Sequence, residues 1–181
     1  MFLSLVQKRR SIRAYLDKPV EAEKIDMLVE TALRSPSSRG FNPWEFIVVT
    51  DRKLLAELSK AKPHGASFLK NAPLGIVVCA APEKCDVWIE DAAIASILLH
   101  LAAESLGLGS CWIQIRKRMH DQAKTAEAYV RERLNIPENL NVESIIAIGY
   151  PAESKPPHRK EDLQYAKVHD NGYGRAYPGP A

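Results

Sequence analysis

The sequence predicts an α+β fold, in which strands far apart along the chain form one sheet covered by helices. Four short apolar runs, rich in β-branched residues, are separated by longer segments whose apolar residues recur at helical spacing. Two glycines, Gly107 and Gly109, follow a predicted helix and precede a strand, the reverse of their order in a Rossmann dinucleotide site. We therefore expect no doubly wound dinucleotide fold.

The elements of the N-terminal half follow from local spacing. Ile25, Leu28 and Ala32 form the buried stripe of an amphipathic helix, and small polar residues with Gly40 end it. Asp51 is placed to cap the helix that follows the first strand. The expected elements are a short helical segment near 2–6, an extended segment at 11–15, a helix at 21–34, a strand at 44–50 and a helix after Asp51.

The C-terminal half continues the alternation. An apolar run too short for a helix predicts a buried strand, and Gly107 supplies a left-handed cap for the long helix before it. The expected elements are a short helix at 67–70, a strand at 74–80, a helix at 86–106, a strand at 110–115, a helix at 121–134 and a strand at 142–149.

The long helix is apolar on nearly every face between residues 92 and 103. Such a helix must be covered on all sides, which predicts contact with a second subunit. His100 lies within it, either as a hydrogen-bonded core histidine or as a catalytic one, and we favour the former. Residues 152–181 form a proline-rich polar tail that is either disordered or wrapped over a partner.

The composition is that of one soluble globular domain spanning 1–181. Hydrophobic residues make up 46% and charged residues 26% of the 181, as in ordinary globular chains. A net charge of +3 without interleaved aromatics does not suit a nucleic-acid surface. We see no apolar leader, and the run 94–103 is too short to cross a bilayer. Three cysteines without metal-ligand spacing, Cys79, Cys85 and Cys111, indicate buried free thiols in a reducing compartment. We expect a cytoplasmic protein that binds neither nucleic acid nor membrane.

Four cations and a hydroxyl stand together in the run Lys8-Arg9-Arg10-Ser11-Ile12-Arg13. Arginine forks and a serine hydroxyl suit a phosphate ester, because charge-assisted bidentate hydrogen bonds fix its geometry. If the segment is extended, Arg9, Ser11 and Arg13 line one side of it. A solvated basic turn is the alternative.

Motifs for protein-borne catalysis are missing from the sequence. It contains no Walker loop, nucleophile elbow, HExxH helix or carboxylate–histidine cluster. An enzyme with this sequence would therefore need a bound cofactor to carry the reaction. Trp44 and Trp112 begin or lie in strands, and we expect them to pack in the core rather than to form an aromatic substrate platform.

Five motifs in order resemble the nitroreductase family of flavoproteins, over about residues 6–168. They are Gln-Lys-Arg-Arg-Ser-Ile-Arg at 7–13 with Lys-Pro-Val at 18–20, Ser-Pro-Ser-Ser at 35–38, the strand from Pro43, Gly-Leu-Gly-Ser-Cys-Trp-Ile at 107–113, and Ala-Ile-Gly-Tyr-Pro at 147–151. The resemblance implies a mostly antiparallel sheet flanked by helices in an intertwined homodimer. FMN would bind at two interface sites, with NADH or NADPH as hydride donor.

The resemblance also implies a set of cofactor-binding residues. Arg9, Arg10 and Ser11 would meet the FMN phosphate and ribityl chain, and Arg13 the pyrimidine edge. The remaining positions are Pro36, Ser37 and Ser38 toward the partner's flavin, Gln114 and Ile115 near flavin N5, and Arg159 on the phosphate. Gly40 stands where many relatives carry asparagine, and the nearby Asn42 takes that place in the expected set. Lys70 and Asn71 are either flavin-ring contacts or exposed helix-end residues, and we favour the latter.

The activity implied is reduction of a nitroaromatic, a quinone or a related small electrophile. Hydride would pass from the nicotinamide to flavin N5 and then to the acceptor on the same face, which gives ping-pong kinetics. A fixed guanidinium such as Arg13 would stabilise the reduced flavin. No catalytic side chain and no metal are expected. The alternative is a flavin-binding carrier or regulatory protein without turnover.

Overall fold

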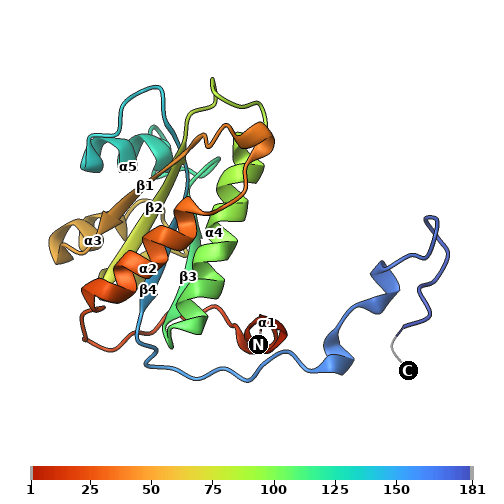
Figure 1. The fold of residues 1–181 in the computed structure, drawn as a ribbon. Coiled ribbons are helices and arrows are strands. Elements are labelled where there is room, and N and C mark those ends of the chain that lie inside the picture. Colours follow the sequence, from red (N-terminus) through yellow and green to blue (C-terminus); the bar gives the residue numbers. More distant parts are fainter. Residues whose placement is uncertain (1, 180–181) are drawn as a thin grey trace.

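The structure is a computed structural model that describes residues 2–179 (Figure 1). Its helices are α1 (Phe2–Lys8), α2 (Ala22–Leu33), α3 (Arg52–Leu58), α4 (Trp88–Ser105) and α5 (Ala126–Leu134). Its strands are β1 (Trp44–Val49), β2 (Leu74–Ala80), β3 (Gly109–Gln114) and β4 (Asn141–Gly149). Short 3-10 turns are η1 (Ser38–Gly40), η2 (Ser67–Asn71), η3 (Lys160–Asp162) and η4 (Tyr165–Lys167).

The four strands form one antiparallel sheet in the order β1-β2-β4-β3. Val77 of β2 pairs with Ile47 of β1 on one side and with Ile145 of β4 on the other. All seven residues of β2 are buried, as expected for a central strand. The expected α+β fold with one antiparallel sheet flanked by helices is confirmed, and the strand predicted at 74–80 has the same bounds.

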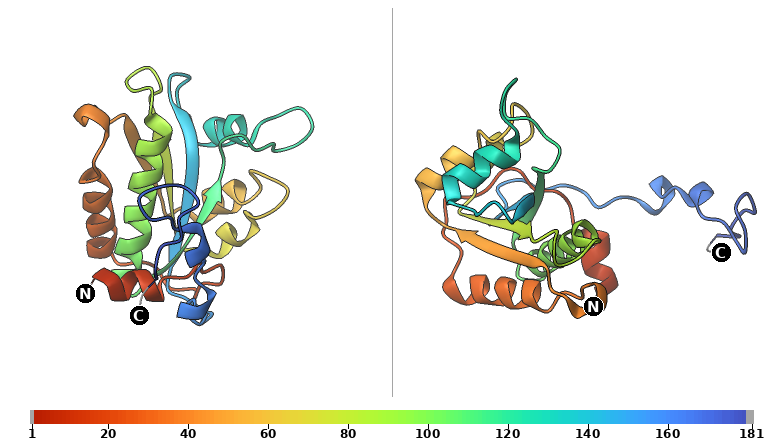
Figure 2. Two further views of the ribbon diagram at one scale, coloured as in Figure 1. Left: turned by 90° about the vertical axis from the view of Figure 1, so that its right-hand side faces the viewer. Right: turned by 90° about the horizontal axis from the view of Figure 1, so that it is seen from above.

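Helices cover both faces of the sheet (Figures 1 and 2). On one face, Leu28 of α2 and Leu99 of α4 pack with Ile146 of β4. On the other face, Leu55 of α3 and Val130 of α5 pack with the opposite side of the sheet. Helix α1 lies against the C-terminal end of α4 (Figure 1). In the strand order, β3 is one edge of the sheet, and the N-terminal segment lies beside it.

Several local expectations are confirmed. His100 is a core histidine whose Nδ1 lies 2.7 Å from Ser110 Oγ. All three cysteines are free and buried, and Trp44 is buried as well. Gly107 ends α4 in the left-handed region at φ 73°. Within residues 2–179, no helix is both long and apolar enough to cross a membrane.

The start of α5 differs from the expectation. The pattern predicts a helix from residue 121, whereas α5 begins at Ala126. Asp121 closes a turn instead, because its Oδ1 accepts the N–H groups of Ala123 and Lys124, both at 2.8 Å. Thr125 is the true N-cap, and its Oγ1 accepts the N–H of Ala128 at 3.0 Å.

The tail after Pro151 first follows the N-terminal segment, where the N–H of Ala152 donates to the carbonyl of Ala14 at 2.9 Å, and then leaves the body of the chain and runs outward (Figures 1 and 2). It carries local structure, since His169 bridges to Ala176 and the N–H of Asp170 donates to the carbonyl of Arg175 at 2.9 Å. Leu163 and Val168 are exposed along it. The described tail thus presents apolar side chains that this chain does not cover.

Candidate functional site

The basic N-terminal segment is extended and lies along the edge of β3. Ser11 forms a parallel bridge with Ser110, and the N–H of Ile12 donates to the carbonyl of Ser110 at 3.0 Å. Ile12 and Tyr15 are buried, whereas Arg13 is exposed. A Cβ on Gly109 would come within 2.8 Å of Ile12, so glycine there is what allows the segment to approach the strand. Ile12 and Tyr15 are three residues apart, so the two-residue alternation predicted for 11–15 is not kept over the whole segment, and Arg9 and Arg13 do not share one side as expected.

Three arginines of the segment have no acidic partner. Among the described residues, no carboxylate lies within 4.0 Å of the side chains of Arg9, Arg10 or Arg13. Arg10 donates to the carbonyl of Pro156, and the Arg13 guanidinium lies 5.8 Å from the ring centre of Phe68. These guanidinium groups are available to a bound anion.

Two carboxylates, Glu104 and Glu153, line the same hollow as Arg10, and the charge of Glu153 is already engaged by other groups. Glu153 Oε1 accepts the backbone N–H of Arg13 at 2.5 Å and lies 3.1 Å from Lys155 Nζ. The hydrogen bond from Arg13 N–H, with Lys155, lowers the pKa of Glu153. Lys155 in turn donates to the carbonyl of Ser11 at 2.7 Å. The beginning of the tail therefore fixes the backbone of the basic segment and leaves its guanidinium groups unneutralised.

The cations of this segment face different spaces. Arg13 lines a hollow of about 540 Å³ together with Tyr15, Lys70 and Asn71, whereas Arg10 lines a smaller one of about 210 Å³. Arg9 lies on the side of α4, where its charge adds to burial in lowering the pKa of His100 to about 4. Lys70 and Asn71 are exposed, as favoured from the sequence, and they nevertheless share a hollow with Arg13.

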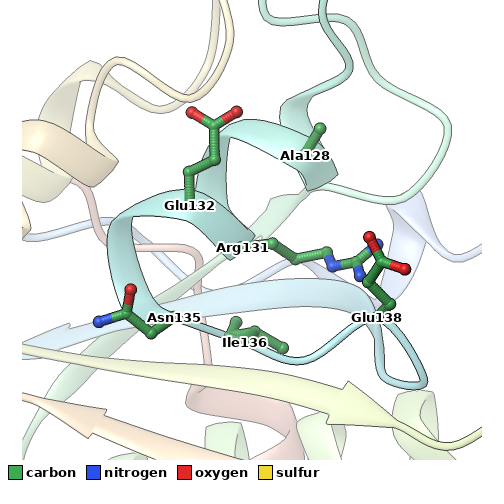
Figure 3. A pocket seen from close by; sticks show the side chains of 6 residues that line it. All are labelled: Ala128, Arg131, Glu132, Asn135, Ile136 and Glu138. Atoms are coloured by element: carbon green, nitrogen blue, oxygen red, sulfur yellow. The ribbon is translucent and has the colours of Figure 1, made fainter.

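The cavity drawn in Figure 3 lies elsewhere. It measures about 440 Å³ and is formed by α5 and the turn that precedes β4. Glu132 and Glu138 contribute two carboxylates to its lining, against the single cation of Arg131. None of the expected site residues takes part in it, and its charges do not suit a phosphate.

The loop with Pro36, Ser37 and Ser38 lies at the other end of α4 from α1 (Figure 1). It is internally fixed: Ser37 Oγ donates to Asn42 Oδ1 at 2.7 Å and accepts the N–H of Asn42 at 2.9 Å. Gly40 has φ 68°, which glycine adopts without strain. Within one chain, this loop and the basic segment are not brought together.

Asp91 of α4 anchors this loop, a role that no pattern in the sequence indicates. Its side chain is 2% exposed. Oδ1 accepts the N–H of Ser38 at 2.9 Å, and Oδ2 accepts the Cys85 thiol at 3.4 Å. Both oxygens of a buried carboxylate are thus used to hold the loop. An aspartate in the first turn of a helix reads from sequence as an ordinary helix-dipole partner.

Gln114 is positioned at the edge strand with its side chain already engaged. Its Nε2 donates to the carbonyl of Arg116 at 3.1 Å and to Glu143 Oε1 at 3.2 Å, while its Oε1 accepts Trp112 Nε1–H at 2.9 Å. Ile115 is buried, and its N–H donates to the carbonyl of Glu143 at 3.1 Å. What this part of β3 offers a ligand is therefore backbone.

The N–H and C=O groups along β3 point alternately toward β4 and toward the open edge of the sheet. The carbonyl of Ser110 points away from β4, since it accepts the N–H of Ile12. In a strand the N–H and C=O of one residue point the same way and alternate between residues. Those of Trp112 and Gln114 therefore point to the open edge as well, beyond the reach of the 11–12 segment.

Glu143 is a further buried group that the sequence did not mark. It is 4% exposed, and burial raises its pKa above the usual range for a glutamate. Its Oε2 accepts no hydrogen bond among the described residues and lies 3.8 Å from Arg116 Nε. Glu143 holds Gln114 in place from behind the strand edge.

The guanidinium of Arg159 is paired within the tail and contacts none of the other candidates among the described residues. It belongs to the tail, where it forms hydrogen bonds to Asp162 at 2.8 and 3.0 Å. These bonds raise the pKa of Arg159 and lower that of Asp162. Any approach of Arg159 to a phosphate site requires a second chain or a movement of the tail.

Comparisons with known proteins show the family and the fold of the chain. The sequence model of the nitroreductase family matches residues 6–63 and 59–150. An FMN-dependent nitroreductase from Clostridium difficile R20291 superposes with a TM-score of 0.93 at 51% identity, covering 94% of this chain and 99% of that one.

Two relatives in sequence are more distant. A protein of Archaeoglobus fulgidus with the provisional name NADH dehydrogenase/NAD(P)H nitroreductase is 38% identical over 164 residues, 88% of this chain and 91% of its own. The FMN reductase (NADPH) of Bacillus subtilis is 29% identical over 194 residues, 94% of this chain and 74% of its own. The chain has the nitroreductase fold, and it belongs to the nitroreductase family of oxidoreductases.

Proposed function

We propose that the protein is an FMN-dependent NAD(P)H oxidoreductase that reduces a small electron-poor acceptor, such as a nitroaromatic or a quinone. The observation that carries the proposal is the set of unneutralised guanidinium groups on the 9–13 segment, next to the free backbone of the β3 edge. A flavin mononucleotide needs a cationic end for its phosphate and paired donors and acceptors for its ring edge. The residues present fit both needs.

In this proposal Arg9, Arg10 and Ser11 bind the phosphate and ribityl chain, and Arg13 faces the pyrimidine edge. The backbone groups of Gln114 at the strand edge orient the ring. FMN, when bound, would supply hydride transfer from NADH or NADPH to the acceptor, which accounts for the missing catalytic motifs. The chain itself contributes binding, orientation and a positive field that favours anionic reactants such as NADH and NADPH.

We further propose a homodimer of single 1–181 domains that shares its two sites between chains. On α4, Ile94 and Ile97 remain 38% and 45% exposed, although a soluble chain rarely leaves a helix face of this kind uncovered. Helix α1 adds exposed Phe2, Leu3 and Val6 beside it. A partner on this surface would bring Pro36, Ser37, Ser38 and Asn42 to a flavin held by the other chain, and would offer the tail with Arg159 a surface to cover.

The experiment is spectroscopic. Purified protein should be yellow, release FMN on denaturation, bleach on addition of NADH or NADPH, and regain its colour when a nitroaromatic is added. Bound FMN that neither nucleotide bleaches would instead identify a flavin carrier without turnover. Protein that binds no FMN, after incubation with an excess, would refute the proposal.

A further inference from the structure

A small cationic hollow lies outside the residues assigned above. It measures about 220 Å³ and is lined by Lys62, Pro63 and His64, from the connection between α3 and η2, and by Arg118 and Met119, from the loop after β3. Its walls come from two loops that are far apart in sequence, and no acidic residue is among its lining.

The two walls are held in place by hydrogen bonds. His120 Nδ1 lies 2.9 Å from the carbonyl of Lys60, which ties one loop to the other. The N–H of Arg118 donates to the carbonyl of Ile115 at 3.1 Å, and its own carbonyl accepts the N–H of Ala126 at 2.9 Å. The hollow is therefore a built feature and not a gap between mobile side chains.

Lys62 and Arg118 are two like charges without a counter-ion. Burial lowers the pKa of the Lys62 ammonium, and the charge of Arg118 lowers it further. Their neighbour Arg116 approaches Glu143 at 3.8 Å, but no carboxylate among residues 2–179 lies within 4.0 Å of the Lys62 or Arg118 side chain. Like charges held together in this way favour the binding of an anion.

The hollow adjoins the candidate flavin site. Its Arg118 wall begins where β3 ends, since the N–H of Arg118 donates to the carbonyl of Ile115 at 3.1 Å, and Ile115 directly follows Gln114 of the open strand edge. An anion bound in the hollow would therefore lie on the loop that continues directly from the strand edge at which we propose that the flavin binds.

We propose that this hollow, the Lys62–Arg118 pocket, binds the phosphate or carboxylate group of a molecule that exchanges hydride at the flavin site. The inference rests on the proposed function. A space of about 220 Å³ holds an anionic group with a few attached atoms and is smaller than a site for a whole ligand. The anion has two sources: the phosphates of NADH or NADPH, and the carboxylate of an acidic acceptor.

The test compares Lys62→Gln and Arg118→Gln with Lys117→Gln, an exposed neighbour that does not line the pocket. Steady-state KM is measured for NADPH and NADH with a neutral quinone, and for the matched acceptors 4-nitrobenzoate and 4-nitrobenzamide. Losing a hydrogen bond to a charged group should raise KM about 10-fold or more for the anionic ligand, with little change in kcat. Lys117→Gln and the neutral acceptor should not change.

The pattern identifies the source of the anion. A rise for NADPH alone assigns the 2′-phosphate, a rise for both nucleotides assigns the pyrophosphate, and a rise for 4-nitrobenzoate alone assigns an acidic acceptor. Unchanged KM values for all four compounds in both variants would overturn the proposal. Loss of FMN from either variant would also overturn it, because the cation would then belong to the flavin cradle.

A binding measurement keeps this proposal separate from the proposed function. Inorganic pyrophosphate and 4-nitrobenzoate are titrated calorimetrically into the purified FMN-loaded protein and its variants. Binding that both variants weaken, in a protein that NADH and NADPH fail to reduce, would refute the oxidoreductase proposal and support the pocket. Binding equal in wild type and both variants would refute the pocket even if the wild-type enzyme turns over.

Discussion

Replacing His100 by glutamine tests how α4 is joined to β3 beneath the basic segment. The imidazole is buried, hydrogen-bonded to Ser110, and has its pKa lowered from 6.5 to about 4, first by burial and then by the charge of Arg9. Between these two values the unfolded chain binds more protons than the folded one. Stability from this group is therefore complete above about pH 6.5 and is lost as the pH falls toward 4.

The size of the effect follows from the shift. At 1.36 kcal/mol per pKa unit, a decrease from 6.5 to about 4 corresponds to about 3 kcal/mol in the free energy of unfolding. Urea unfolding is followed from pH 7.5 to 4 at fixed protein concentration for wild type and His100→Gln. Carboxylates titrate in both proteins, so the difference between the two curves isolates His100. We expect the wild type to lose about 2–3 kcal/mol more than the variant over this range.

A matched control is His158→Gln, which changes an exposed histidine of the tail. Its curve should run parallel to that of wild type. If His100→Gln also runs parallel, the imidazole titrates alike in the folded and unfolded states, and the assignment of His100 as a buried neutral link between α4 and Ser110 is wrong.

Three further changes address the site and the assembly. Asp91→Ala removes the acceptor of the Ser38 N–H and the Cys85 thiol. The free energy of unfolding in urea should fall by about 1.5–3 kcal/mol, and Cys85 should react faster with a thiol reagent. A Cys85 that stays unreactive would contradict the role assigned to Asp91. Ile97→Glu should yield monomers with reduced FMN by sedimentation at the flavin absorbance, and a monomer with full FMN would refute the shared site. Arg9→Ala should weaken FMN binding roughly 10–100-fold in a dialysis assay, whereas Arg34→Ala, which changes the exposed residue after α2, should not.

The choice of Ile97 corrects an idea drawn from the sequence. An all-round apolar helix suggests that any residue of 92–103 can test the dimer, and Ala95 stands in the middle of it. The structure buries Ala95 completely within its own chain, whereas Ile97 is 45% exposed. A charge at Ala95 would disrupt the core and so could not separate loss of the dimer from loss of the fold.

Local patterns predicted the sheet and most helices because their signals are short-range. The run 74–80 is apolar throughout and bounded by Pro73, so its bounds needed no tertiary information. The start of α5 was mispredicted because Asp121 and Thr125 are both good caps. Which of them caps the helix depends on the Asp121 turn, which satisfies the carboxylate with the N–H groups of Ala123 and Lys124.

Some residues of the candidate site could likewise be predicted from local sequence, and others could not. The cations of 9–13 are adjacent in sequence and could be found there. Asp91 acts on Ser38 across 53 residues, and Gln114 is held by Glu143 across 29. A single aspartate or glutamate inside a helix or strand carries no mark of such a partner, because the partner is set by how the elements pack.

The edge position of β3 connects the flavin site with the proposed dimer. An open strand edge invites pairing with other chains, and proteins usually cover it. Here the 11–12 segment covers the edge at Ser110 and stops before Trp112 and Gln114. A flavin ring edge would satisfy the donors and acceptors left there. The exposed faces of α1 and α4 lie beside the same edge (Figure 2). Cofactor and partner would then each cover a surface that the isolated chain leaves open, and loss of either should weaken the binding of the other.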